Sequence, residues 1–404
     1  MIALYLLEPD DPGAAWAPFA GVRPVAELRA GAWRIRERWE AACAADATAI
    51  LGGHVRAFHE GDEPPVRPVG PIDGPAVVGC SWFAPAGVRL LEPDALAGGP
   101  VRRLLHGDRT VGWLVPGGQR WEGPADTGEP VPVDGIALRG AFDLVTALEH
   151  FLADDCADLR AAPSTGVPDG SLVFGRPEDV VVMGAAVEPG VVFDVRHGAV
   201  VLESGVEVRH GTRLEGPVYV GARTRVLGGF IRASAFGPEC RVHGEIAGSI
   251  FLGYANKSHD GFVGHSVVGH WVNLGALTTT SNLKNTYGPV RLEVGGVRIE
   301  TSRQNLGTLF GDHAKTAIGT MLATGTVVSA GANVFGAVTP PKFIPPFAWG
   351  ATSGERVTPD GFLQVAERVM SRRNVTLTPE RRRSLEETFA RGVQAAAAAG
   401  EPNQ

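Results

Sequence analysis

The chain has 404 residues, 44% of them hydrophobic and 20% charged, which is enough for two or three domains with sizeable cores. A net charge of −7 leaves no overall basic footprint, so neither nucleic acid nor an anionic membrane is expected as a partner. The four cysteines are scattered and form no CxxC pair, which disfavours a disulfide scaffold and makes a reducing cytoplasm the expected compartment.

Residues 1–165 are expected to form an α/β domain. The apolar run Ile2–Leu7 predicts a buried first strand, since no basic segment precedes it as in a signal peptide. Pro24 fits the first turn of a helix that is predicted to continue through Trp39. Later elements are predicted as strands at 76–78 and 111–115 and as a closing helix, with apolar residues at helical spacing, at 142–159.

Residues 175–340 carry apolar and glycine positions that recur about every six residues, a period that does not suit a helix. Six residues make one flat side of a coil, and three sides make a turn of about eighteen residues around a narrow apolar core. This hexapeptide repeat predicts a parallel β-helix, and a β-sandwich with regular turns is the alternative. The steps that carry the pattern include Val220–Gly221, Val226, Phe236–Gly237, Val242, Ile318–Gly319 and Gly331–Val334.

Residues 341–404 are expected to form a C-terminal extension with two short helices. The proline-rich segment Pro340–Pro346 is predicted to end the coil, because consecutive prolines cannot continue a hydrogen-bonded ladder. Helices are predicted near 360–373 and 379–398, and the second begins at Thr378 with a proline at its first helical position.

The densest polar chemistry of the chain lies between Glu245 and Tyr287. His259 is the catalytic candidate, because an imidazole that is neutral near pH 7 can take a proton from an amine or hydroxyl nucleophile. The alternative is a surface histidine on a loop that interrupts the repeat. The surrounding amides and charged groups could position a substrate or stabilise an oxyanion. These candidate binding residues are Asn256, Lys257, Asp260, Asn273, Asn282 and Lys284.

Each of these groups also has a structural interpretation. Asn273 and Asn282 could form an internal amide ladder at the corners of the coil instead of contacting a substrate. Lys257 and Lys284 could meet a phosphate or lie on a solvated rim. The sequence leaves both interpretations open for all four residues.

Three histidines of the repeat suggest a different enzyme. His265 and His270 are near one another in sequence, and His243 lies one or two turns earlier. Parallel β-helices can hold a metal with imidazoles from adjacent turns and adjacent subunits. This pattern motivates a zinc hydratase of the γ-carbonic-anhydrase type as an alternative, but the spacing is weak evidence and no residue is assigned as a metal ligand.

Arginines near the first predicted helix form a candidate nucleotide site. Arg23 and Arg29 could bind phosphate with help from helix N–H groups. The alternative is a solvated helix face with charge pairs to residues such as Glu40. A glycine-rich phosphate loop after the first strand is absent, since Glu8–Gly13 reads EPDDPG.

Several segments resemble a known family. The run Arg23–Gly31 with Trp39–Glu40, then Gly253–Phe262, Phe310–His313 and Pro341–Pro345, resemble variant bacterial sugar nucleotidyltransferase/acetyltransferase proteins. That family is related to the bifunctional N-acetylglucosamine-1-phosphate uridylyltransferase/glucosamine-1-phosphate N-acetyltransferase. The resemblance implies an N-terminal nucleotidyltransferase domain, a left-handed β-helix and a homotrimer that binds acetyl-CoA between neighbouring helices.

The resemblance also implies roles for single residues. His259 falls on the general-base histidine of the acetyltransferase, Asn273 on an acceptor-side asparagine, and Asn282 on the asparagine of a Thr-Cys-Asn-Tyr motif. The chain departs from the better-known enzymes at several positions. Tyrosines are replaced by Phe262 and Leu283, and a Lys-Lys pair is replaced by Ala-Gly. The family's Gly-x-Gly-Thr-Arg loop and a clear metal-binding aspartate are missing from the N-terminal part.

The predicted function is therefore that of a cytoplasmic sugar-nucleotide enzyme. The β-helix is expected to transfer an acetyl group from acetyl-CoA, as co-substrate, to an amino-sugar 1-phosphate. The N-terminal domain is expected to bind a sugar phosphate and a nucleoside triphosphate, with Mg²⁺ bridging phosphates in any nucleotidyl transfer. Three alternatives stay open: a nucleotidyltransferase only, a non-catalytic trimeric sugar-nucleotide-binding scaffold, and the zinc hydratase.

Overall fold

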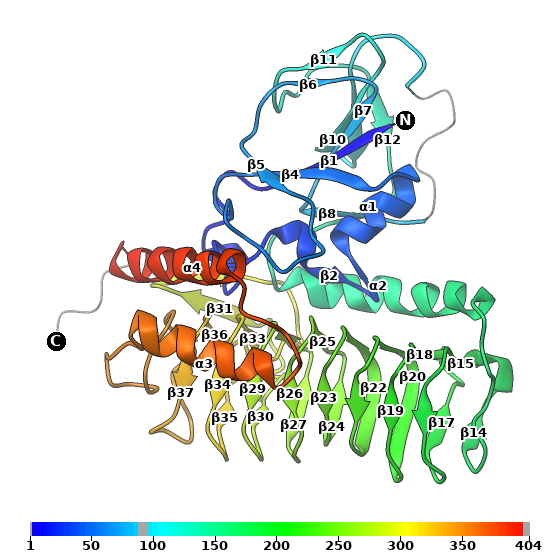
Figure 1. The fold of residues 1–404 in the computed structure, drawn as a ribbon, viewed down its shortest axis with the longest axis vertical. Helices are drawn as coiled ribbons and strands as arrows, with labels where there is room; N and C mark the ends of the chain where they lie inside the picture. The colour runs from blue at the N-terminus through cyan, green and yellow to red at the C-terminus, as the bar shows by residue number, and fades with distance from the viewer. Residues whose placement is uncertain (1, 88–95, 399–404) are drawn as a thin grey trace.

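The computed structural model describes residues 2–87 and 96–398, and Figure 1 shows a sheet-containing N-terminal part that stands on the side of a long coil. The expected fold class is confirmed, because an α/β part, a parallel β-helix and two C-terminal helices follow one another along the chain. Within the described ranges, no helix is both long enough and apolar enough to cross a bilayer.

The N-terminal part is built on one mixed sheet of seven strands. The strands β7, β1, β4 and β5 run parallel, so their carboxyl ends lie at the same edge, whereas β10 runs antiparallel to β7 and β9. In spatial order the strands are β12 (Pro130–Pro132), β9 (Arg102–His106), β10 (Arg109–Val115), β7 (Ala76–Cys80), β1 (Ala3–Leu7), β4 (Ala47–Leu51) and β5 (Val66–Arg67).

Short elements surround this sheet. They are η1 (Ala14–Trp16), η2 (Val25–Glu27), β2 (Arg29–Ala30), β3 (Trp33–Arg34), α1 (Ile35–Cys43), β6 (Ile72–Asp73), β8 (Phe83–Pro85), β11 (Arg120–Trp121) and β13 (Gly135–Ala137). Helix α1 is fixed to the sheet by Trp39, whose ring covers Gly79 and whose Nε1 donates to the Phe83 carbonyl at 3.0 Å.

The helix predicted from Pro24 through Trp39 is wrong in its first half. Only a single 3-10 turn, η2, follows Pro24, and the chain then reverses at Gly31 before α1 begins at Ile35. Gly31 has a φ of 80°, and a Cβ there would lie 2.3 Å from the Asp155 carboxyl group. A continuous helix cannot form because the chain must turn here to pass Asp155.

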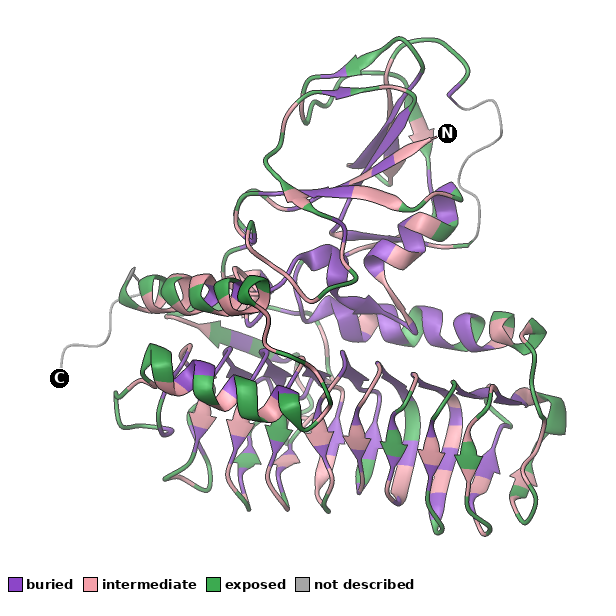
Figure 2. Cartoon of the chain, viewed as in Figure 1, coloured by how far each residue is buried: buried purple, intermediate pink, exposed green. Residues whose placement is uncertain are grey.

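Helix α2 (Asp143–Asp158), followed by η3 (Leu159–Ala161), connects the sheet to the coil. Its side chains Leu144, Leu148 and Phe151 belong to a core that also contains Tyr219 and Ile250 of the coil. Each such side chain, once buried, stabilises the fold by about 1.5–3 kcal/mol. Figure 2 shows the first half of α2 buried between the two parts, so the N-terminal part and the coil share one hydrophobic core.

The coil has three faces, named here in the order in which each turn visits them. The first face contains β14 (Leu172–Phe174), β17 (Val192–Asp194), the first halves of β20 (Thr212–Val220) and β22 (Gly229–Phe236), β24 (Glu245–Ala247), β27 (Phe262–Gly264), β30 (Thr279–Thr280) and β35 (Met321–Leu322).

The second face lies under α2 and the N-terminal part. It contains β15 (Val180–Val182), β18 (Val200–Leu202), the second halves of β20 and β22, β25 (Ile250–Phe251), β28 (Val267–Val268), β33 (Leu309–Phe310), β36 (Val327–Val328) and β38 (Phe343–Ile344).

The third face is a stack of two-residue strands in register. It contains β16 (Ala186–Val187), β19 (Glu207–Val208), β21 (Arg225–Val226), β23 (Arg241–Val242), β26 (Asn256–Lys257), β29 (Asn273–Leu274), β34 (Lys315–Thr316) and β37 (Asn333–Val334). A 3-10 turn, η4 (Pro177–Asp179), precedes β15, and a hairpin of β31 (Arg291–Val294) and β32 (Val297–Glu300) is inserted between β30 and β33.

The proline-rich segment does not end the ladder at Pro340, as predicted, because β38 pairs with β36 inside it. The hydrogen bonds explain why: Val327 N donates to the Lys342 carbonyl at 2.7 Å, and Ser329 N donates to the Ile344 carbonyl at 3.0 Å. The segment therefore contributes carbonyl acceptors, so the missing N–H groups of its prolines do not matter here.

Two helices follow the coil, as predicted. Helix α3 (Pro359–Ser371) begins at Thr358, whose Oγ1 accepts a hydrogen bond from Gly361 N at 3.1 Å. Helix α4 (Pro379–Ala398) returns to the N-terminal part, where Ser384 Oγ accepts from His59 N at 3.2 Å. The C-terminal helices therefore join the end of the coil to the sheet (Figure 1).

Candidate functional site

The catalytic candidate His259 lies at the corner where the third face turns into the first face, between β26 and β27. Both His259 and Asp260 are exposed, and the His259 imidazole makes no hydrogen bond or ion pair with any described residue. The Asp260 carboxyl group lies 3.3 Å from His243 Nδ1, and its carbonyl accepts from Leu277 N at 2.8 Å. The corner is thus held by its backbone, while the His259 ring stays available to a ligand.

Lys257 holds this corner from inside the coil. It occupies the inward position next to Val242 on the third face and is fully buried. Its Nζ donates to the carbonyls of His243, at 3.3 Å, and His259. Burial lowers the pKa of Lys257 to about 8, against the opposing pull of Asp260. The structure therefore places Lys257 as a backbone clamp under His259, away from the surface where a phosphate would bind.

Asn282 and Lys284 lie beyond the other end of the first face, after β30. Asn282 Nδ2 is 2.7 Å from His265 Nδ1, and it lies against Gly264, beside the Phe262 ring. Lys284 Nζ donates to the Pro289 carbonyl at 2.8 Å within the inserted loop. The first face therefore separates these two residues from the His259 corner in the single chain.

Asn256 and Asn273 lie on the third face, one directly above the other. Asn256 Nδ2 donates to Asn273 Oδ1 at 2.7 Å, and Ser258 Oγ donates to Asn256 Oδ1 at 2.6 Å. An amide ladder is thus present, but it points outward into a hollow beneath α3 that Tyr254 and Trp271 also line. The predicted binding residues are divided between this hollow, the His259 corner and the inserted loop.

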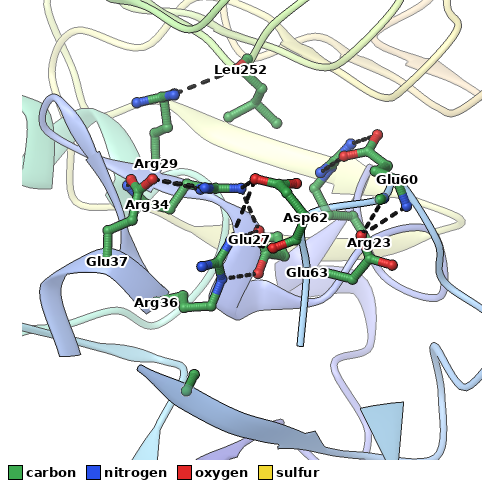
Figure 3. A network of polar contacts seen from close by, with 12 residues as sticks. Arg23, Glu27, Arg29, Arg34, Arg36, Glu37, Glu60, Asp62, Glu63 and Leu252 are labelled. Carbon is green, nitrogen blue, oxygen red and sulfur yellow. Dashed lines mark hydrogen bonds and ion pairs between the residues drawn. The ribbon is translucent and has the colours of Figure 1, made fainter. Parts of the chain in front are cut away.

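Arg23 is buried at the junction of the three parts of the molecule. Its guanidinium contacts Glu60 at 2.6 and 2.8 Å and Asp312 of the coil at 2.9 and 3.1 Å, as drawn in part in Figure 3. Arg29 donates instead to the carbonyls of Leu252, at 3.4 Å, and Ala32. Both arginines therefore connect the N-terminal part to the coil. They also line a cavity of about 550 Å³ between these parts, where carboxyl groups and backbone carbonyls already accept from them.

The neighbouring arginines are also neutralised. Figure 3 shows Arg34 and Arg36 around the buried Glu27, with distances of 3.1 Å and 2.6 Å to its carboxyl oxygens. Arg36 also pairs with Glu40, four residues on, at 3.1 Å. The predicted pairing along the helix is present, but it belongs to a largely buried network that includes Asp62 at 2.6 Å from Arg34.

The carboxyl edge of the parallel strands is occupied by Glu8, which follows β1. In open α/β sheets this edge is where ligands bind. The fully buried Glu8 carboxyl group accepts from Val25 N at 2.7 Å and Ala26 N at 3.1 Å, at the start of η2. Burial raises the pKa of Glu8 to about 7, although both backbone hydrogen bonds oppose this shift. Two N–H groups that could meet a phosphate are thus taken by the protein's own side chain.

The three histidines of the zinc alternative have different neighbours. His243 lies beside Asp260, His265 beside Asn282, and His270 Nδ1 is 2.9 Å from Glu60. Across residues 2–87 and 96–398 there is no group of three or more His, Cys, Asp or Glu side chains that could hold a metal ion. The described part of one chain therefore offers no set of metal ligands that would support the zinc hydratase alternative.

Sequence reasoning missed two groups of functional interest. One is Glu8, whose sequence context EPDDPG shows only that a glycine-rich loop is absent. The other is a set of cations around Asn256 and Asn273, namely Arg241, Lys315, Arg372 and Arg373. The repeat could have revealed Arg241 and Lys315, because both occupy outward positions of the third face. In the register of that face, Arg241 pairs with Asn256 and Asn273 pairs with Lys315.

Comparison with known proteins bears on the N-terminal part. Residues 6–78, from β1 into β7, match a family model described as sugar nucleotidyl transferase. The resemblance stated from the sequence is confirmed for this part. The match includes Glu8, Arg23 and Arg29, so the residues that close the strand edge lie inside the matched domain.

Curated relatives are similar over short stretches. A bifunctional sugar-1-phosphate nucleotidylyltransferase/acetyltransferase of Sulfurisphaera tokodaii is 32% identical over 91 residues, which are 22% of this chain and 23% of the relative. Bifunctional protein GlmU of Methanococcus vannielii is 35% identical over 86 residues, 21% of this chain and 20% of that protein. GlmU of Methanocaldococcus jannaschii is 33% identical over 86 residues, 21% of each chain. The matched stretch thus spans about a fifth of the length of these relatives.

Proposed function

We propose that this chain is a transferase of sugar-nucleotide biosynthesis, whose coil moves an acetyl group from acetyl-CoA to an amino-sugar 1-phosphate. The observation that carries the proposal is the His259 imidazole, exposed at a rigid corner of the β-helix and bonded to no described residue. The names of the relatives, which combine nucleotidyltransferase and acetyltransferase activities, support the same pathway. The buried thiols of all four free cysteines fit the expected cytoplasmic location.

In the proposed reaction His259 acts as a general base. The imidazole takes a proton from the sugar amine while the nitrogen attacks the thioester carbonyl carbon of acetyl-CoA. The carbon–sulfur bond then breaks, and coenzyme A leaves as a thiolate that receives the proton from the imidazolium. Asn273 and Asn282 remain the proposed substrate contacts, and Lys257 supports the reaction by holding the carbonyls of His243 and His259.

A homotrimer is part of the proposal, because one chain does not bring the predicted residues together. Beside the His259 corner, the first face carries a row of exposed apolar side chains that begins at Leu277, 59% exposed. Such a row is unusual on a surface that stays in water, and contact with a second copy would cover it. The row consists of Leu277, Ile318, Met321 and Val338.

Nucleotidyl transfer by the N-terminal part is the second candidate function, favoured by the family match over residues 6–78. The strand edge does not fit Mg²⁺ well: Glu8 is bonded to two N–H groups, and the nearby Asp10 and Asp11 are exposed. Nucleotide phosphates could reach the Val25 and Ala26 N–H groups only if the Glu8 side chain moves away from them.

The proposal is tested by supplying purified protein with acetyl-CoA and glucosamine 1-phosphate and following the release of free thiol. His259→Ala is expected to lower the rate about 10²–10⁴-fold, the usual contribution of a general base. His197→Ala is the matched control, because His197 is also an exposed histidine of the coil but lies on an early turn.

Equal rates for the wild type and His259→Ala, with both proteins folded, would contradict the role of His259. An absence of thiol release from the folded wild type would overturn the assigned acceptor. Sugar-nucleotide formation that survives His259→Ala would instead favour the nucleotidyltransferase-only alternative.

A further inference from the structure

A second site lies on the third face, beneath the end of α3. A hollow of about 430 Å³, a size typical of small-molecule sites, separates the coil from the last turn of this helix. We name it the cationic groove. Its lining residues that carry charge are Arg241, Lys315, Arg372 and Arg373, and neither aspartate nor glutamate is among the lining residues.

The cations of the groove contact mainly backbone carbonyls. Arg241 Nη1 donates to the carbonyls of Arg223, Glu239 and Cys240 at 3.1, 3.2 and 2.9 Å. Lys315 Nζ donates to the His313 carbonyl at 2.9 Å, and Arg373 Nε donates to the Glu239 carbonyl at 3.4 Å. The Arg372 side chain makes no hydrogen bond or ion pair with any described residue. The groove therefore gathers positive charge that backbone carbonyls do not neutralise.

The carboxyl group of Glu239 contacts one arginine of the groove, Arg241, and a second arginine outside it. Arg241 Nη2 is 3.5 Å from Glu239, whose other oxygen lies 2.6 Å from Arg223 outside the groove. Burial, followed by the charge of Arg225, lowers the pKa of Arg241. Burial, followed by the charge of Arg241, likewise lowers the pKa of Arg373. The charge of Glu239 raises both pKa values, but it does not outweigh burial and the neighbouring arginines.

Burial also lowers the pKa of Lys315, to about 8. Below that pH its ammonium group is mainly charged, so the groove carries four positive charges at neutral pH. A ligand that supplies negative charge would relieve the repulsion among them and replace the hydration that Lys315 and Arg241 have lost.

The uncharged groups of the groove also present donors. Asn273 uses its Oδ1 to accept from Asn256, which leaves its Nδ2 without a partner among the described residues. The Tyr254 hydroxyl likewise makes no hydrogen bond within the described part of the chain, and the ring stacks on Trp271 at 4.3 Å. A matching ligand must be rich in acceptors and negatively charged, as phosphate oxygens are.

We propose that the cationic groove binds the phosphate groups of a ligand that carries at least two of them. Arginines suit this role because their planar groups donate two hydrogen bonds to one phosphate, and Lys315 adds a point charge. Two sources share this chemistry, a nucleoside 5′-diphosphate and the adenosine 3′,5′-diphosphate end of coenzyme A. The choice between them rests on the proposed function, whereas phosphate binding itself does not.

The test is a calorimetric titration of the full chain, first with inorganic pyrophosphate and then with uridine 5′-diphosphate and adenosine 3′,5′-diphosphate. Saturable binding to the wild type is expected. The double variant Arg372→Ala/Arg373→Ala should weaken it at least tenfold, since it removes two charge-assisted contacts. Asn273→Asp should weaken it as strongly, because it adds a negative charge while keeping an oxygen that accepts from Asn256.

Arg382→Ala/Arg383→Ala is the matched control, an adjacent arginine pair on α4 outside the groove. It should bind like the wild type, and circular dichroism should show that all variants are folded. Tighter binding of one of the two nucleotides identifies the source of the phosphates. The proposal is overturned if the wild type does not bind pyrophosphate, if the groove variants bind it normally, or if the α4 variant loses as much affinity. These results do not depend on turnover, so they can fail or succeed independently of the acetyl transfer.

Discussion

The strand edge of the N-terminal part and the cationic groove of the coil are two places where donors gather, and they differ in what occupies them. At the strand edge, the N–H groups of Val25 and Ala26 are taken by the Glu8 carboxyl group. In the groove, Arg372 and the Asn273 amide nitrogen have no partner within the described ranges. The first place is closed by the protein itself, and the second is open to a ligand.

This difference shows that arginines alone do not identify a phosphate site. An arginine that is already paired with a carboxyl group has less charge to offer a phosphate than one without such a partner. In the N-terminal part, Arg23, Arg34, Arg36 and Arg38 each contact a carboxyl group at 3.1 Å or less. Those arginines hold the sheet, the coil and α2 together. In the groove, Arg241 and Arg373 donate to backbone carbonyls, and Arg241 shares the Glu239 carboxyl group with Arg223. Arg372 makes no contact of this kind within the described ranges, so positive charge remains for binding.

Replacing Arg23 by Met should have the largest effect on stability. It leaves Glu60 and Asp312 near one another without their shared cation, and breaking such a buried pair costs about 3–5 kcal/mol. Arg372→Met, at an exposed arginine, should change the stability by less than about 0.5 kcal/mol. Thermal unfolding of both variants checks the contrast.

Binding should show the reverse order. Arg372→Met should weaken diphosphate binding, whereas folded Arg23→Met should bind like the wild type. If Arg23→Met left the melting temperature unchanged and weakened nucleotide binding, Arg23 would be a phosphate ligand, as the sequence suggested, and the comparison would fail.

A smaller effect is expected from Glu8→Gln, and it should depend on pH. The pKa of Glu8 is about 7 in the folded chain against an ordinary value of 4.5, so the folded state holds the proton more tightly. The stability from this proton is fully present below pH 4.5 and is lost as pH rises through 7. The wild type should therefore lose about 3 kcal/mol more than Glu8→Gln between pH 4.5 and 8.

Melting temperatures of the two proteins at both ends of this range provide the measurement. Parallel pH profiles would contradict the account, because they would show that Glu8 is not buried with its proton at the strand edge. A steeper profile in the wild type would support the closed state of that edge.

The coil was predictable from sequence because its signal is local and repeated. Each turn places an apolar residue inward and a small residue at a corner. This pattern can therefore be recognised in the sequence without knowledge of distant contacts. The alternation of inward and outward positions in this repeat also predicts that Lys257 points inward, because Lys257 pairs with the inward residue Val242 on the neighbouring turn. Its charge favoured a binding role instead, and the structure shows the chain using it to hold two carbonyls.

Other features depend on contacts that the sequence does not contain. Lys315 follows Asn273 directly in the third-face stack, but the inserted β31–β32 hairpin separates them by 42 positions and hides the register. Arg372 reaches the groove only because α3 folds back along the coil. Glu8 closes the strand edge only because η2 brings the Val25 N–H group to it.

The most direct test of the account compares two reactions of the same wild-type protein. Thiol release from acetyl-CoA with glucosamine 1-phosphate reports on the coil, and pyrophosphate release from a nucleoside triphosphate with a sugar 1-phosphate reports on the N-terminal part. The account predicts thiol release that His259→Ala lowers about 10²–10⁴-fold, with pyrophosphate release near background while Glu8 occupies the strand edge. Rapid pyrophosphate release that persists in His259→Ala, without thiol release, would contradict it.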